Sequence, residues 1–355
     1  MSDKKIRLTF AGGGWVIVMT ITVLLALITW AIAPAVFRMS TLPPGDNETI
    51  ESYRFDLTNL SMEKEMVVPA MRHRNMSPVS TSPLILNSTK IKAMNNSNRD
   101  PLLVSKDLVV GVKIDDDIRA YPLHFLHVHE IINDTLGGKP IAVIWHWPSG
   151  QIAVFERTVH GSVAEFLNSG LSGNGGMLLY ERQTEVGGEQ LYSTLLGNTV
   201  TGSDKKLIPV IHDVVPWSDW HRRFPETTVV APNEQLKKRY RKASPELYFL
   251  NNQFYFPTSP KPEDAFSQKT PVIVVGASGI TKIYALEQLL SIANENSVVT
   301  DTVGDVTVEI TIFSDPLSAR VQATSGEIES ITNALWFAWY ANYPTATITV
   351  LTQQE

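Results

Sequence analysis

"DLVVGVKIDDDIRAYPLHFL", residues 107–126, and "PVIVVGASGITKIYALEQLL", residues 271–290, resemble each other closely enough to decide the fold. Tyr121 of the first stretch corresponds to Tyr284 of the second. In each stretch a valine-rich run is followed by a turn signal and a second apolar run, a pattern typical of a β-hairpin. In the first stretch the turn is expected at Asp115–Asp117. A hairpin that occurs twice predicts a β-rich protein with an internal repeat.

Two further blocks recur in the same order. "NDTLGGKPIAVIWH" at 133–146 resembles "TDTVGDVTVEITIF" at 300–313, and "WSDWHRRFPETTVV" at 217–230 resembles "WFAWYANYPTATIT" at 336–349. We therefore predict an α+β fold that is predominantly β, with two duplicated halves of β-hairpins and short helices, plus one N-terminal transmembrane helix. The expected parts are a cytoplasmic N-terminus (1–14), a transmembrane anchor (15–37), a tether and extended loop-rich segment (38–100), a first β-rich repeat (101–231), a linker (232–270) and a second, shorter β-rich repeat (271–355).

The N-terminal region predicts attachment to a membrane. The basic stretch "MSDKKIRLTFAGGG" precedes the uncharged run from Trp15 to Phe37, which as a helix would span roughly 34 Å and cross a bilayer. The positive charges predict a cytoplasmic N-terminus at the inner (cytoplasmic) membrane, with the bulk of the chain periplasmic or extracellular. A cleaved signal peptide is the alternative, because "AIAPA" at 31–35 has the small residues of a cleavage site.

Charge and cysteine content exclude several kinds of function. The formal net charge of −6 argues against a nucleic-acid partner. The chain contains no cysteine, so disulfides, thiolate metal sites and cysteine nucleophiles are excluded. The basic run "LKKRYRK" at 236–242 is interpreted either as a solvated linker or as a contact for anionic lipid headgroups.

The two predicted repeats differ in a way that indicates where a site should be sought. The second repeat has no counterpart of Phe166–Gly202 and contains no histidine. Features that both repeats share, namely the tyrosine, the Asp-Thr pair and the paired tryptophans, are most simply scaffold. Features confined to the first repeat are the candidates for function.

Histidines of the first repeat suggest a metal site. In "HFLHVHEIIND" at 124–134, His127 and His129 are two apart and would share one face of a strand. An even-residue loop at Gly137-Gly138 would pair His146 with His127 or His129, with Cβ atoms about 5 Å apart. Three imidazoles at that distance could hold zinc, copper or iron. Glu130 and Asp134 would provide second-shell hydrogen bonds to the ligands.

Less specific interpretations of the same residues stay open. An odd-residue loop would place His146 on the opposite face and remove the metal site. The histidines can equally be neutral, hydrogen-bonded core residues. A nucleophilic role for Ser149 rests on its nearness to His146 in the sequence alone.

The blocks "VVGVKIDDDIRAYPLHFLHVHEIINDTLGGKPIAVIW", "LLYERQTE", "LYSTLLGNTVTG" and "WSDWHRRFPETTVV" resemble the bacterial and archaeal family of domain of unknown function 3179. The likeness runs from about Phe55 to Val230. Typical members carry a Cys-Pro-x-Cys-type motif where this chain has "HWPS", so the resemblance sets His146 and Ser149 at the two cysteine positions. His129, Glu130, Asn133 and Asp134 match the family's pattern, and the missing dithiol excludes thiol redox chemistry.

We expect a membrane-anchored extracytoplasmic accessory or interaction protein rather than an enzyme, with a membrane protein as partner. The anchor, the missing cysteines and the histidine-free second repeat favour this expectation. The alternative is a metal-binding or metalloenzyme domain that uses His127, His129 and His146.

Overall fold

The computed structural model describes residues 14–41, 43–97, 101–159, 161–183, 188–240, 245–263 and 266–351. The chain divides into two compact units, Met1–Pro44 and Gly45–Glu355, and each is described by itself.

The first unit contains one long helix, α1 (Gly14–Thr41). Its span Gly14–Ala33 is apolar and long enough to cross a membrane, and none of it is buried against protein. The hydroxyl of Thr20 donates to the carbonyl of Val16 at 2.8 Å, so this polar group is satisfied within the helix, as a bilayer requires. The predicted apolar helix is confirmed, and it is compatible with a membrane anchor or a signal sequence.

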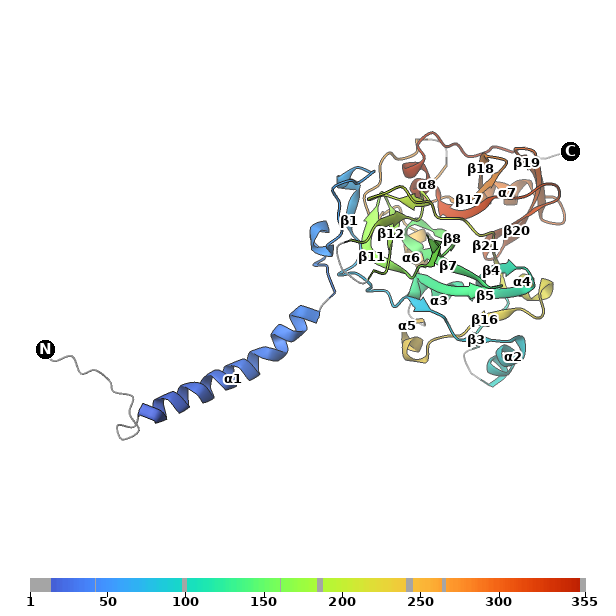
Figure 1. Ribbon diagram of the computed structural model, residues 1–355. Coiled ribbons are helices and arrows are strands. Elements are labelled where there is room, and N and C mark those ends of the chain that lie inside the picture. The colour runs from blue at the N-terminus through green and yellow to red at the C-terminus, as the bar shows by residue number, and fades with distance from the viewer. Residues whose placement is uncertain are drawn as a thin grey trace. The chain divides into compact units, whose positions relative to one another are not determined.

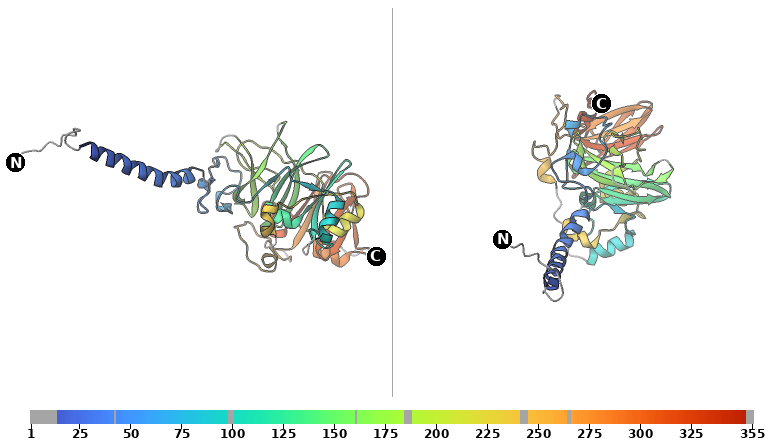
Figure 2. Two further views of the ribbon diagram at one scale, coloured as in Figure 1. Left: turned by 90° about the horizontal axis from the view of Figure 1, so that it is seen from below. Right: turned by 60° about the vertical axis from the view of Figure 1, so that its left-hand side comes forward.

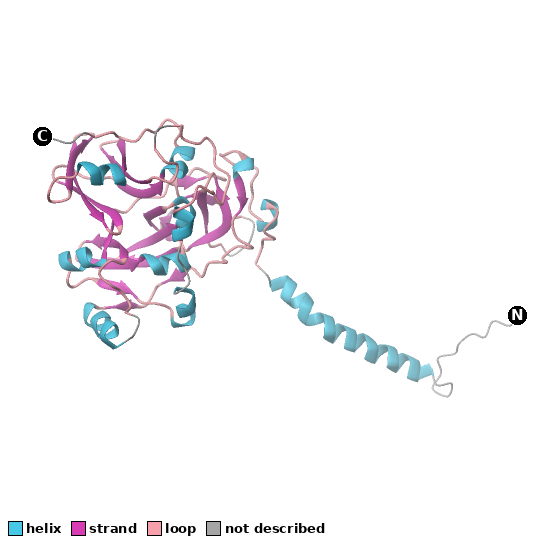
Figure 3. Ribbon diagram, turned by 180° about the vertical axis from the view of Figure 1, so that it is seen from behind, coloured by secondary structure: helices cyan, strands magenta, loops and turns pink. Residues whose placement is uncertain are grey.

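The second unit, which we call the body, is built mainly from β-sheets, with short helices at their edges (Figure 3). The eight-stranded sheet has the order β19 (Val298–Val303), β20 (Val306–Ser314), β21 (Leu317–Ala323), β15 (Asp213–Pro216), β4 (Leu108–Ile114), β5 (Asp117–Pro122), β16 (Thr228–Val230) and β3 (Ile85–Leu86). The seven-stranded sheet has the order β18 (Ile280–Ala285), β17 (Pro271–Ala277), β22 (Ser330–Leu335), β8 (Gln151–Glu156), β7 (Lys139–His146), β6 (Ile131–Leu136) and β2 (Ser80–Thr81).

A smaller sheet and the short helices complete the body (Figure 1). The five-stranded sheet has the order β1 (Val67–Pro69), β11 (Phe166–Gly173), β12 (Gly176–Glu181), β13 (Leu191–Ser193) and β14 (Asn198–Thr199), and β9 (Thr158–Val159) pairs with β10 (Ser162–Val163). The α-helices are α2 (Ser88–Ser97), α3 (Leu123–His129), α4 (Trp217–Arg223), α5 (Lys237–Tyr240), α6 (Glu246–Phe249), α7 (Leu286–Ile292) and α8 (Trp336–Asn342). The 3-10 turns are η2 (Ile50–Tyr53), η3 (Lys64–Met66), η4 (Trp147–Ser149) and η5 (Glu234–Leu236).

Turn chemistry sets the hairpins where the sequence predicts them. β4 pairs with β5 up to Ile114 opposite Asp117, with Asp115 at a φ of 52°. β6 pairs with β7 through a two-residue loop, Gly137-Gly138, in which both glycines have positive φ. This is the turn that suits the twist of a hairpin. The even-residue loop required for the predicted register is therefore confirmed.

The segments predicted as repeats, 101–231 (the first half) and 271–355 (the second half), share both large sheets. Apart from β9–β14 and β16 of the first half, their strands and helices follow one another in the same order. The hairpin β4–β5 joins β15 and, through it, the strands β19–β20–β21 of the other half, with Val214 opposite Ala319. Reciprocally, the hairpin β17–β18 joins β22 and, through it, β8–β7–β6, with Asn333 opposite Ile152. Figure 2 shows the green strands of the first half beside the orange strands of the second. Duplication of the sequence stays a prediction, which this shared order supports.

The insertion confined to the first half forms most of the five-stranded sheet. Its strands cover one face of β6 and β7, where Ile131, Ala142 and Ile144 pack with Phe166 and Leu179 in one apolar cluster. The segment predicted as an extended tether, 38–100, adds β1, β2, β3 and α2 to the body. Of these additions, β2 pairs with β6, the strand that follows the predicted site residues His129 and Glu130.

Candidate functional site

The predicted histidines lie at one end of the β6–β7 hairpin, but on different elements. His127 and His129 belong to α3, which continues through His129 before β6 begins at Ile131. The expectation that they share a face of a strand is therefore wrong. The register is one of the two predicted, with Ile131 opposite Ile144, but the helix ends the ladder before His129 can pair with His146.

Both ring nitrogens of His129 are hydrogen-bonded to other groups of the protein. Nδ1 lies 2.5 Å from the carbonyl oxygen of Pro78, and Nε2 lies 2.7 Å from the hydroxyl of Tyr240. A carbonyl only accepts, so Nδ1 carries the proton and Nε2 accepts from Tyr240. Burial lowers the pKa of His129, which keeps the ring neutral. Metal binding at Nε2 would first have to displace Tyr240.

His127 contacts two tryptophans. Its Nδ1 accepts a hydrogen bond from the indole Nε1 of Trp145 at 3.4 Å, and its ring lies 5.9 Å from that of Trp147. An indole only donates, so in the neutral ring Nε2 carries the proton. Burial lowers the pKa of His127.

His146 and Ser149 form a buried pair. Nδ1 of His146 lies 2.7 Å from Oγ of Ser149, which also lies 3.1 Å from the carbonyl oxygen of His146. The ring of Phe256 stacks on His146 with centroids 6.3 Å apart. Burial lowers the pKa of His146 to about 3, so the imidazole is neutral and a weak base. A base this weak does not activate Ser149 as a nucleophile at neutral pH.

Glu130 is a buried carboxyl group aimed at the inserted sheet. Its backbone has a φ of 59°, uncommon outside glycine, and this conformation ends α3 and turns the side chain away from ordinary strand alternation. Oε2 accepts hydrogen bonds from Ser77 at 2.5 Å and Asn168 at 2.7 Å. Burial raises the pKa of Glu130 to about 7, against the lowering effect of these hydrogen bonds.

The face that carries His146 also meets the inserted sheet. His146 lies opposite Gln151 in the β7–β8 ladder, and cross-strand neighbours share a face. The amide of Gln151 donates to the carbonyl of Thr194 at 2.7 Å and accepts from its hydroxyl at 2.5 Å. Glu130 and His146 therefore both face the insertion, which has no counterpart in the second half.

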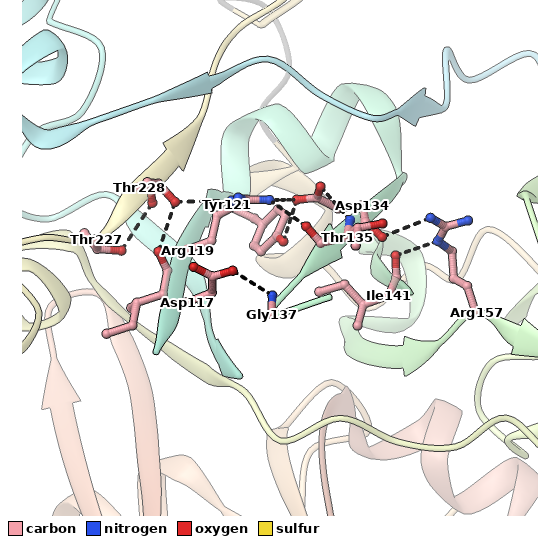
Figure 4. A network of polar contacts seen from close by, with 11 residues as sticks. Asp117, Arg119, Tyr121, Asp134, Thr135, Gly137, Ile141, Arg157, Thr227 and Thr228 are labelled. Carbon is pink, nitrogen blue, oxygen red and sulfur yellow. Dashed lines mark hydrogen bonds and ion pairs between the residues drawn. The ribbon is translucent and has the colours of Figure 1, made fainter. Parts of the chain in front are cut away.

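Asp134 belongs to a separate polar network. Its Oδ2 accepts from Arg119 at 2.5 Å and from the hydroxyl of Tyr121 at 2.8 Å, and the three side chains converge in Figure 4. Arg157, which follows β8, donates to the carbonyl of Asp134 at 2.9 Å. This arrangement links β5 and β6 to the residue after β8, and among the described residues it gives Asp134 no hydrogen bond to the three histidines.

The second half contains the equivalent of this network. The hydroxyl of Tyr284 donates to Asp301 at 2.7 Å, and Lys282 contacts the same carboxylate at 2.8 Å. Tyr284 and Asp301 are the residues that the sequence blocks match to Tyr121 and Asp134. Because both halves contain the pair, it supports the interpretation of these residues as scaffold.

Within the described residues, no group of three or more His, Asp or Glu side chains is placed to hold a metal ion. Zinc, copper or iron at His127, His129 and His146 stays a prediction that this geometry does not support. Ser77, Asn168, Tyr240 and Phe256 were not predicted to contact these residues. Of these, Asn168 could have been suspected from the sequence, because it lies in the insertion confined to the first half.

A cavity of about 330 Å³ lies beside α3. Its lining includes His124, Phe125 and Asp107, and also Tyr240, whose hydroxyl contacts His129. Burial lowers the pKa of His124. Tyr240 therefore lines the cavity and also hydrogen-bonds His129.

Comparison with known families identifies the group of proteins to which the chain is related. Residues 83–330 match the family model described as protein of unknown function (DUF3179). The chain belongs to the DUF3179 family. Searches of curated proteins and of solved structures found no match. The matched region of this DUF3179 protein includes α3, β6, β7 and the insertion, and excludes α1.

His146 and Ser149 lie at the two positions that the family resemblance predicts to be cysteines in typical members. That cysteines occupy these two positions in relatives stays an expectation from the resemblance. In this chain the two side chains are buried and joined by a hydrogen bond of 2.7 Å. The family match itself brings no activity.

Proposed function

We propose that this DUF3179 protein is a membrane-anchored extracytoplasmic accessory protein, a subunit of a membrane complex that carries out no thiol redox chemistry. α1 would hold it in the cytoplasmic membrane, with its N-terminus cytoplasmic and the body on the other side. The body would act by binding a membrane-protein partner.

The observation that carries this proposal is the His146–Ser149 pair. The two positions where the resemblance predicts a dithiol contain buried side chains that are hydrogen-bonded to each other. The lowered pKa of His146 makes it a poor base. The neighbouring polar groups are likewise engaged, Glu130 by Ser77 and Asn168, and His129 by Tyr240. A set of satisfied, buried groups stabilises a rigid binding body and offers no reactive side chain.

Extraction and purification test the proposal. The tagged full chain, expressed in its native host and extracted in a mild detergent after brief cross-linking, should co-purify with a membrane protein. A matched chain whose apolar span is replaced by an unrelated transmembrane helix should keep this partner if the body binds it. A chain that elutes alone with and without cross-linking would contradict the proposal.

Metal binding is the second candidate. It is favoured by the hydrogen bonds of His127 and His146, which among the described residues engage Nδ1 of each ring and leave Nε2 without one. Metal analysis of the purified full chain beside a His129→Ala/His146→Ala double variant tests it. Near-stoichiometric metal that disappears in the variant would support this function, and background metal in the parent would exclude it.

A further inference from the structure

Large apolar side chains of the linker between the two halves face solvent. Leu247 is 81% exposed, Leu250 83% and Tyr255 62%. Single exposed leucines are ordinary, but several within one short segment mark a contact surface. We call Leu247, Leu250 and Tyr255 the apolar linker surface.

The segment that carries this surface is held in place. Tyr248 is buried, and its hydroxyl donates to the carbonyl of Pro148 at 2.7 Å. The ammonium of Lys269 donates to the carbonyl of Tyr248 at 2.6 Å and lies 3.4 Å from its ring centroid. Leu247 and Leu250 flank the Tyr248–Phe249 anchor, so they are directed outward by a fixed backbone.

A basic run lies on the same linker. Lys237, Lys238 and Arg239 are exposed, and among the described residues their one ion pair joins Lys237 to Glu234 at 3.8 Å. Such a run attracts an anionic surface, and each basic residue close to an anionic leaflet contributes about 1 kcal/mol to lipid attraction.

The helix that carries the Lys237–Arg239 run, α5, contacts α3 (Figure 1). In α5, Tyr240 packs on Phe125 of α3 with ring centroids 4.9 Å apart. In α6, Phe249 packs in the same apolar cluster as Leu123 of α3. The cationic and apolar groups are therefore carried by segments whose buried residues both pack near α3.

The chain itself keeps a bilayer within reach of the body. The apolar span ends at Ala33 and the body begins at Gly45. A connection this short gives the bilayer surface a high effective concentration at the body, so weak interfacial contacts suffice.

We propose that the apolar linker surface and the Lys237–Arg239 run contact the headgroup layer of the anionic bilayer in which α1 is inserted. Leucine and tyrosine side chains would enter the interface while the basic side chains bind lipid phosphates. The basic run favours lipid over a protein as the occupant. This inference rests on anchoring by α1, as proposed above.

Because the chain has no cysteine, one introduced thiol reports one position. Leu250→Cys in the full chain is labelled with an environment-sensitive fluorophore and reconstituted in nanodiscs of phosphatidylglycerol and phosphatidylcholine that contain nitroxide-labelled lipid. Ile280→Cys, on β18 and 50% exposed, is the matched control. The fluorescence emission of the label at position 250 should shift to the blue. The nitroxide should quench it at least about twofold more than it quenches the label at position 280. High salt or Lys238→Glu/Arg239→Glu should remove most of the difference, since exposed charges are screened.

Equal quenching at positions 250 and 280 would overturn the inference. Shielding of position 250 in native membranes but not in pure-lipid discs would also overturn it and assign the surface to a protein partner. Failure of anchoring would appear separately, as chain that does not elute with the discs. The same two labels are then read on that chain with added phosphatidylglycerol vesicles, where unequal quenching supports lipid contact and equal quenching overturns it.

Discussion

Nδ1 of His146 lies 2.7 Å from Oγ of Ser149 in a buried turn that follows β7. The two residues are three apart, and such residues in a turn have Cα atoms closer than about 7 Å, a separation that also suits a disulfide. Cα atoms this close are the first requirement for a disulfide between the two positions. The separation is therefore compatible with the resemblance, which predicts cysteine positions here.

Cysteines introduced at positions 146 and 149 should form a disulfide. We expect His146→Cys/Ser149→Cys to form the bond under mild oxidation, so that maleimide labels the unfolded chain only after reduction. The single variants His146→Cys and Ser149→Cys are the controls and should label without reductant. Full labelling of the oxidised double variant would mean that the turn does not bring the two positions together.

Glu130 predicts an unusual dependence of stability on pH. Its pKa is about 7 in the folded chain, above the ordinary value of 4.5, so the folded state binds more protons than the unfolded state between these values. The stability that Glu130 contributes is fully present below pH 4.5 and is lost as pH rises through 7. Glu130→Gln, which mimics the protonated acid, should therefore gain stability relative to the parent, by about 3 kcal/mol from pH 4.5 to pH 8.

Urea unfolding of the full chain in detergent, measured from pH 4.5 to pH 8, checks this prediction. Taking the difference between variant and parent removes the opposite contribution of His146, whose lowered pKa costs stability as pH falls below 6.5. A difference that does not change with pH would show that Glu130 titrates normally.

The sequence predicted the local parts of the fold well. The apolar helix and the hairpin turns at Asp115 and Gly137-Gly138 depend on residues close together in the chain, and turn chemistry reports such structure directly. The end of α3 could not be predicted in this way. "HFLHVHE" has apolar residues that fit a helix or a strand, and the boundary depends on the positive φ of Glu130.

The candidate site required contacts that the sequence does not encode locally. Ser77 comes from the segment before the first half, Asn168 from the insertion and Tyr240 from the linker. Each meets Glu130 or His129 across a long stretch of chain. Each large sheet combines a hairpin of one half with strands of the other, which is likewise a long-range pairing. A repeat in the sequence does not predict which hairpin joins which sheet.

The equivalent tyrosines provide a test of the scaffold interpretation. Tyr121→Phe and Tyr284→Phe each remove one hydrogen bond to a carboxylate, Asp134 or Asp301. Each variant should lose about 1–2 kcal/mol of unfolding free energy, with partner binding unchanged under conditions where both remain folded. Urea unfolding measures the first effect and co-purification the second. Loss of the partner in Tyr121→Phe alone would assign Asp134 to a binding site instead.

Two equivalent glycines should respond differently to the same substitution. A Cβ added at Gly111 would lie 2.3 Å from the ring of Trp220, which is buried and donates a hydrogen bond to Thr227 at 2.9 Å. The ring cannot move without breaking this contact, so Gly111→Ala should cost about 3 kcal/mol, as overpacked cores do. At Gly276 the added Cβ meets the hydroxyl oxygen of Ser330 at 2.4 Å and nothing else within 3.6 Å. A hydroxyl can rotate away, so Gly276→Ala should cost less than about 1 kcal/mol.

Neither glycine has a positive φ, so backbone strain does not enter the comparison. Urea unfolding of both variants measures the difference, and equal losses would mean that Trp220 does not pack on β4 in the manner described.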